Sequence, residues 1–70
     1  MSKKELLTMK KEALKLYDIF MQAYMMEASR GYRKDIRDCV ESSYIRFMNI
    51  NNKLPEEHRI KSAVTLSLSA

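Results

Sequence analysis

The sequence predicts an all-α protein, a three-helix bundle in which a long antiparallel helix pair is followed by a short third helix. Apolar residues recur every three or four positions over most of the chain, which is the spacing of one helix face. The chain contains one glycine and one proline, so few positions interrupt a helix. Hydrophobic residues make up 46% of its 70 residues, which is not the composition of a disordered chain. Residues 1–70 are therefore expected to form a single helical domain.

The first helix is expected over about residues 3–29. Ser2 is a candidate N-cap, and Glu5 follows it at the spacing of a capping box. The segment 19–26 is apolar on nearly every side, so it must be covered from more than one direction. Gly31 is expected to end the helix in a left-handed conformation, which glycine adopts without strain.

The second and third helices are expected over about residues 33–49 and 55–65. Short connections make neighbouring helices run antiparallel. Pro55 fits the first position of the third helix, and the carboxylates of Glu56 and Glu57 favour a helix start.

The size of the chain limits its own core, because a domain of this length buries only about 60% of the surface that it exposes when unfolded. Cys39 is the only cysteine, so an intrachain disulfide is excluded. His58 is distant from it in sequence, and the two do not form a zinc pattern. We therefore expect a partner to supply burial and the isolated chain to be poorly folded or self-associated.

The formal net charge of +4 favours acidic partners, which include proteins, nucleic acids and anionic membranes. No apolar stretch approaches the roughly 20 residues of a membrane-spanning helix. We therefore do not expect a membrane-spanning protein.

One set of residues is distributed over the first two predicted helices at regular spacing. It consists of Leu16, Tyr17, Ile36, Arg37, Val40 and Tyr44. With the small size and the basic charge, this ladder resembles the LYR-motif family of small mitochondrial accessory proteins. Asp18 replaces the arginine of the family motif, which gives the degenerate form Leu-Tyr-Asp and removes a fork of hydrogen-bond donors. The resemblance extends over about residues 10–62.

The resemblance implies a non-enzymatic adaptor or accessory subunit. Many LYR proteins bind an acyl carrier protein, whose acyl-phosphopantetheine arm enters between their helices, while they dock on a client complex. Such clients include cysteine desulfurase, respiratory complexes, ATP synthase and the mitochondrial ribosome. The resemblance thus implies a location in the mitochondrial matrix or on the matrix side of the inner membrane. It also implies no cofactor other than the arm that the carrier supplies.

Two sets of side chains are candidates for these contacts. We expect the acyl chain to be lined by Tyr17, Phe20, Tyr24, Val40, Tyr44 and Phe47. We expect the acidic carrier to dock on a basic ridge of Arg30, Arg33, Lys34 and Arg37.

Each set also has a simpler interpretation. The aromatic and aliphatic set is equally the pattern of an ordinary core, and the ridge can pair with acidic residues on its own helix. The pairs at the required spacing are Arg37 with Glu41 and Lys34 with Asp38. Cys39 is expected to be an inert small hydrophobe and His58 a surface residue.

Other function classes are less favoured by the sequence. No catalytic constellation, metal-ligand set or glycine-rich phosphate loop occurs in it, so we do not expect an enzyme. A small basic helical nucleic-acid-binding or regulatory protein is an alternative, although the second helix lacks a dense base-reading face. A purely structural subunit of a large assembly is another alternative.

Overall fold

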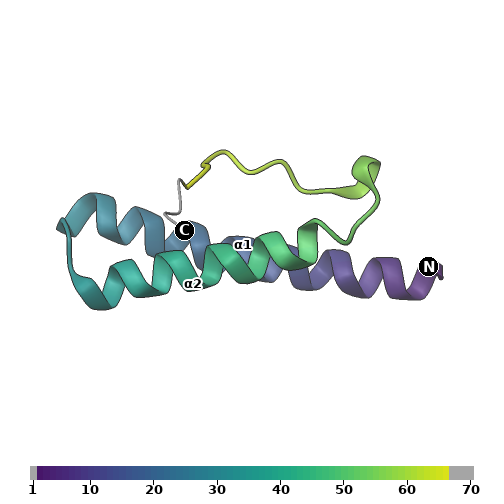
Figure 1. Cartoon of the computed structure of the whole chain (residues 1–70), viewed down its shortest axis with the longest axis horizontal. Coiled ribbons are helices and arrows are strands. Elements are labelled where there is room, and N and C mark those ends of the chain that lie inside the picture. Colours follow the sequence, from purple (N-terminus) through teal and green to yellow (C-terminus); the bar gives the residue numbers. More distant parts are fainter. Residues whose placement is uncertain (1, 67–70) are drawn as a thin grey trace.

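The computed structural model describes residues 2–66, which form two long antiparallel helices, a single 3-10 turn and an extended C-terminal segment (Figure 1). Helix α1 spans Lys3–Arg30, α2 spans Lys34–Asn51 and η1 spans Glu56–His58. No strand occurs among the described residues. The all-α fold class and the long antiparallel pair are confirmed. Of the predicted domain 1–70, residue 1 and residues 67–70 lie outside the described part.

Both ends of α1 follow from local signals in the sequence. The hydroxyl of Ser2 accepts a hydrogen bond of 3.2 Å from the amide of Glu5, so the predicted N-cap is confirmed. Gly31 ends the helix with φ of 83° and ψ of −178°, a region of backbone conformation that is essentially restricted to glycine. Its φ is positive as predicted, but its ψ is extended. The chain therefore leaves α1 abruptly and re-enters a helix at Lys34.

The predicted third helix over residues 55–65 is wrong. Only Glu56–His58 are helical, and Pro55 precedes this turn with an extended ψ of 146°. Residues 59–66, which we name the strap, are extended along the helix pair (Figure 1). An extended segment of this length reaches about 26 Å, whereas a helix would reach about 12 Å. The strap therefore touches both ends of the core, which a short helix could not do.

Side chains of the strap alternate between half-buried and exposed positions. The inward positions, all half-buried, are Ile60, Ser62, Val64 and Leu66, and the intervening residues are exposed. This period of two is the pattern of an extended chain with one face on a surface.

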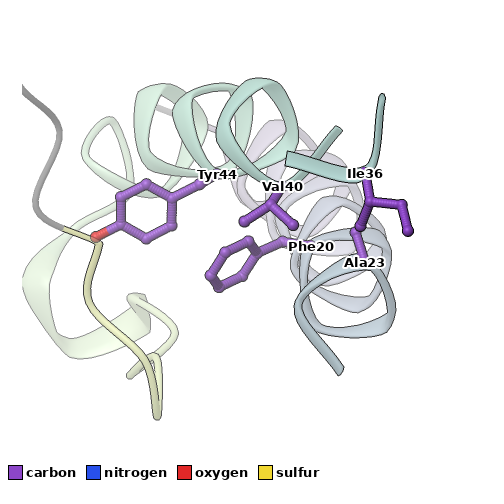
Figure 2. Packing of buried hydrophobic residues seen from close by; sticks show 5 residues of the cluster. All are labelled: Phe20, Ala23, Ile36, Val40 and Tyr44. Carbon is purple, nitrogen blue, oxygen red and sulfur yellow. The ribbon is translucent and has the colours of Figure 1, made fainter. Parts of the chain in front are cut away.

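The core consists of two adjoining clusters between α1 and α2. One contains Phe20, Ala23, Ile36, Val40 and Tyr44 (Figure 2). The other contains Ala13, Leu16, Phe47 and Leu54. Val64 and Leu66 of the strap pack on the first cluster, and Ile60 packs on the second. None of the described helices is long and apolar enough to cross a membrane.

Candidate functional site

The residues predicted to line an acyl chain are largely enclosed in the core of the protein itself. Phe20, Val40 and Phe47 are 0% exposed, and Tyr44 is 6% exposed. The Phe20 and Tyr44 ring centroids lie 4.9 Å apart, a distance of direct aromatic contact. Figure 2 shows Phe20 and Val40 directed toward each other between the helices. An acyl chain at this position would have to separate side chains that already fill the space.

Tyr17 and Tyr24, the other two predicted lining residues, lie half-buried at the edge of the core. The Tyr17 ring packs at 5.1 Å from the ring of Phe47. Its hydroxyl accepts a hydrogen bond of 3.1 Å from the backbone amide of Ala63. This tyrosine of the Leu-Tyr motif therefore fastens the strap to α1, a contact that sequence analysis missed because the two residues are 46 positions apart.

The other motif residues divide in the same way between core and surface. Leu16 and Ile36 are each 8% exposed and belong to the core, as do Val40 and Tyr44. Arg37 remains partly accessible at the junction of the two helices.

Arg37, one of the four residues of the predicted basic ridge, is engaged in two ion pairs. Arg37 donates to the carboxylate of Glu27 on α1 at 2.8 Å, and its Nε lies 3.7 Å from the carboxylate of Glu41. The pairing of Arg37 with Glu41 is therefore confirmed, but Arg37 mainly joins α2 to α1. The predicted pairing of Lys34 with Asp38 is not among the ion pairs of the described residues.

Three cations of the ridge remain exposed around the turn at Gly31. Arg33 pairs with Asp35 at 3.1 Å, and both of these side chains are more than half exposed. Arg30 and Lys34 are exposed and form no ion pair within the described residues. A pair as exposed as Arg33 with Asp35 contributes little to stability, so Arg33 can exchange this partner for another.

Glu27 was not identified from the sequence as a contact residue. Its position, four residues after Ala23 and seven after Phe20, is on the inner face of α1, and this spacing was the available signal. One carboxylate oxygen accepts from Arg37, whereas Oε2 is buried without a hydrogen-bond partner among the described residues. Removal of Arg37 would therefore leave a largely buried charge uncompensated.

An apolar groove is open on the side of the helix pair that faces away from the strap. Ile19 and Met26, which contribute to its wall, each lie two residues from a tyrosine on the strap side of α1. Two residues rotate a side chain by about 200° around a helix. The groove has a volume of about 280 Å³ and is lined by Ile19, Gln22, Ala23, Met26, Asp35, Ile36 and Cys39.

The sequence predicts that Cys39 is an inert small hydrophobe and that His58 is a surface residue. Cys39 is exposed in the wall of the groove rather than enclosed in the core. His58 is half-buried in η1. Within residues 2–66, no group of three potential ligand side chains that could hold a metal ion occurs.

The start of the strap is held by the side chains of Asn51, which lies just beyond the predicted end of the second helix, and Arg59, which lies within the predicted third helix. Asn51, the last residue of α2, is 6% exposed. Its side-chain amide donates to the carbonyl of Ile60 at 3.0 Å and accepts from the amide of Ile60 at 2.9 Å. Arg59 donates to the carbonyls of Leu54 at 2.9 Å and Asn52 at 3.1 Å. These bonds satisfy backbone groups beyond the end of α2.

Comparisons of the chain with protein-family models, with curated proteins and with solved structures gave no match. The arrangement of the residues is therefore what supports a function. It combines a closed core, an apolar groove open on one side, and a cationic turn at one end of that groove.

Proposed function

We propose that this protein is a non-enzymatic adaptor of the LYR type, which binds an acyl carrier protein and joins it to a client complex in mitochondria. The observation that carries the proposal is that the groove and the exposed cations lie at the same end of the helix pair. Met26 in the groove wall and Arg30 are four residues apart on α1, and this spacing puts them on one face. On α2, Lys34 directly precedes Asp35, another lining residue.

This arrangement suits a partner that has an acidic surface and carries an apolar group. Exposed arginine and lysine attract an acidic helix over a long range, and the groove offers apolar walls to whatever that helix carries. Its volume of about 280 Å³ is close to the lower end of the range of about 300–1,000 Å³ for small-molecule pockets. Met26 can adapt its flexible side chain to a guest of irregular shape.

We place the acyl chain in this groove rather than among the core residues predicted to line it. Entry into the core would separate Phe20 from Tyr44 and displace Val64 and Leu66 of the strap. Binding in the groove leaves these contacts intact. Ala23 and Ile36 take part in both regions, so a guest in the groove would lie against the outside of the core.

Co-expression with an acyl carrier protein, followed by purification and intact mass measurement, tests the proposal. We expect an acylated, phosphopantetheine-bearing carrier to co-elute with the parent chain. Substitution of Ile19→Ser together with Met26→Ser should abolish retention of long-chain acyl carrier. Ile45→Ser is the matched control, because Ile45 is 45% exposed on α2 and lies outside the groove.

A second pair of variants tests the cationic turn. Arg30→Gln with Lys34→Gln should weaken carrier binding, most strongly at low salt, whereas Lys53→Gln with Lys61→Gln should not. Arg37 is unsuitable for this test, because its loss would leave the carboxylate of Glu27 without its ion-pair partner. Retention on nucleic acid without carrier binding would instead support the nucleic-acid-binding alternative. Association with a client subunit in the absence of any carrier would support the structural-subunit alternative.

A further inference from the structure

The outer surface of the first half of α1 carries a pattern that the proposed function does not use. Leu7 is 58% exposed. On a helix, the surface neighbours of a residue are those three and four positions away. For Leu7, all four of these neighbours are lysines, namely Lys3, Lys4, Lys10 and Lys11.

Leu14 extends the same pattern by two helical turns. It is 49% exposed, and Lys11 and Lys10, three and four positions before it, are its neighbours as well as those of Leu7. On its other side, the neighbours of Leu14 are Tyr17 and Asp18. We name the surface formed by these residues the lysine face. It consists of Lys3, Lys4, Leu7, Lys10, Lys11 and Leu14.

Of the acidic residues in this part of α1, Asp18 borders the lysine face, four residues after Leu14, and accepts a hydrogen bond from Gln22, whereas Glu5 and Glu12 are directed elsewhere. Glu5 is two residues from Leu7, and Glu12 is two residues from Leu14, which rotates each carboxylate by about 200° from its leucine. None of the lysines of the lysine face forms an ion pair within the described residues. The face therefore presents unbalanced positive charge around two exposed leucines.

Exposed apolar residues elsewhere do not share this environment. Ile45 on α2 is 45% exposed, but its neighbours at three and four positions are Glu41, Ser42, Met48 and Asn49. Encirclement by lysine is therefore not a general property of the exposed apolar side chains of this protein.

The lysine face is exposed at every residue except Lys10, which is half-buried. Leu6 and Met9 of the same segment pack against the core cluster of Leu16 and Phe47, which fixes the orientation of the segment and turns Leu7 outward. Figure 1 shows the N-terminal part of α1 extending past the end of α2.

We propose that the lysine face binds an anionic lipid surface, with α1 lying in the plane of the membrane and Leu7 and Leu14 inserted at the boundary between headgroups and acyl chains. An interfacial helix of this kind has apolar residues on one stripe and lysine or arginine beside it. Lysine side chains can lay their methylene stems along an apolar layer while their ammonium groups reach the headgroups.

The chemistry of the lysine face favours lipid over other acidic partners. A nucleic acid would use the ammonium groups but would leave Leu7 and Leu14 in water. A folded acidic protein generally binds side chains that enter pockets or grooves, whereas the lysine face is the convex surface of a single helix. A membrane matches both the dispersed point charges of lysine and the apolar ridge between them.

Sedimentation of the full chain with vesicles tests this proposal. We expect the parent chain to bind vesicles containing phosphatidylserine, to bind neutral phosphatidylcholine vesicles much more weakly, and to be released from the anionic vesicles by high salt. Each Lys→Gln substitution at positions 3, 4, 10 and 11 should lower partitioning about fivefold. Leu7→Ala with Leu14→Ala should lower it about tenfold.

Matched variants separate this effect from unfolding and from simple charge attraction. Ile45→Ala removes an equally exposed apolar side chain, and Lys53→Gln with Lys61→Gln removes two lysines elsewhere, so both should bind vesicles like the parent. Equal binding to neutral and anionic vesicles would overturn the proposal. Full binding by the Leu7→Ala, Leu14→Ala variant would also overturn it, because the face would then act as a plain polycation. Since no residue of the groove or the turn is changed, carrier binding should persist in every variant.

Discussion

The two sides of the helix pair both carry apolar side chains, but one side is covered by the strap and the other is open. On one side, the strap covers the core and is anchored by Asn51, Tyr17 and its own Arg59. On the other side, Ile19 and Met26 are about 40% exposed along an open groove. The protein therefore uses its short C-terminal segment to close one side and leaves the other available to a partner.

Polar contacts determine which side is closed. The amide group of Asn51 offers one donor and one acceptor, and these match the carbonyl and amide of Ile60. Such a pairing fixes the register of an extended segment, as a neighbouring strand would. The described hydrogen bonds of the strap all involve the end of α2, the following turn, η1, the strap itself or Tyr17.

The largest expected effect is on the strap side. Replacement of the inward residues by serine, as Ile60→Ser, Val64→Ser and Leu66→Ser together, should lower the free energy of unfolding by about 3–5 kcal/mol. The matched control changes the outward residues, as Lys61→Ser, Ala63→Ser and Thr65→Ser, and should change it by less than about 1 kcal/mol. Denaturation monitored by circular dichroism gives both values. Equal losses in the two variants would show that the alternation does not describe the strap in solution.

Asn51→Ala should have the next largest effect, a loss of about 2–3 kcal/mol. This substitution leaves the amide and the carbonyl of Ile60 without partners in a half-buried position, and an unsatisfied buried group costs about 1–3 kcal/mol. Asn49→Ala is the control, because Asn49 is exposed on the same helix. If both variants unfold at the same denaturant concentration, Asn51 does not anchor the strap.

Tyr17→Phe should cost about 1 kcal/mol, because it removes one hydrogen bond and keeps the ring against Phe47. Hydrogen exchange of the Ala63 amide should accelerate more than that of the Ile60 amide, which Asn51 still holds. Tyr32→Phe, at a residue that is 76% exposed, should change neither rate. An unchanged hydrogen-exchange rate of the Ala63 amide in the Tyr17→Phe variant would show that the Tyr17 hydroxyl does not hold the strap.

These contacts also explain which features the sequence could predict. The ends of α1 depend on local signals, a capping hydroxyl at Ser2 and a glycine at position 31, and both were identified. The predicted third helix relied on equally local signals at Pro55, Glu56 and Glu57. The hydrogen bonds that join Tyr17 and Asn51 to the strap outweigh these local helix signals. Residues 60–66 carry only a weak signal for an extended segment, because Ser62 lies at an inward position and Ala63 at an outward one, and the partner surface of the strap was not evident from sequence.

The candidate site was only partly predictable for a related reason. Helical periodicity identifies the inner face of each helix but does not show whether the two faces touch or leave a space. Phe20, Val40 and Phe47 were therefore placed correctly toward the other helix, and only the structure shows that they fill the core. The all-round apolar character of segment 19–26 did indicate coverage from more than one direction. Within the described residues, α2 and the strap cover two sides of this segment, whereas Ile19, Met25 and Met26 remain 40–64% exposed.

The smallest effect on stability is expected on the open side. Ile19→Ser with Met26→Ser should lower the free energy of unfolding by no more than about 1 kcal/mol, because about 40% of each side chain is already in contact with water. The same variant should reduce self-association of the isolated chain, which sedimentation velocity at several concentrations would measure. Exposed apolar patches promote such association when the natural partner is absent. A large loss of stability together with unchanged association would mean that the groove is covered in solution, and the contrast between the two sides of the helix pair would then no longer hold.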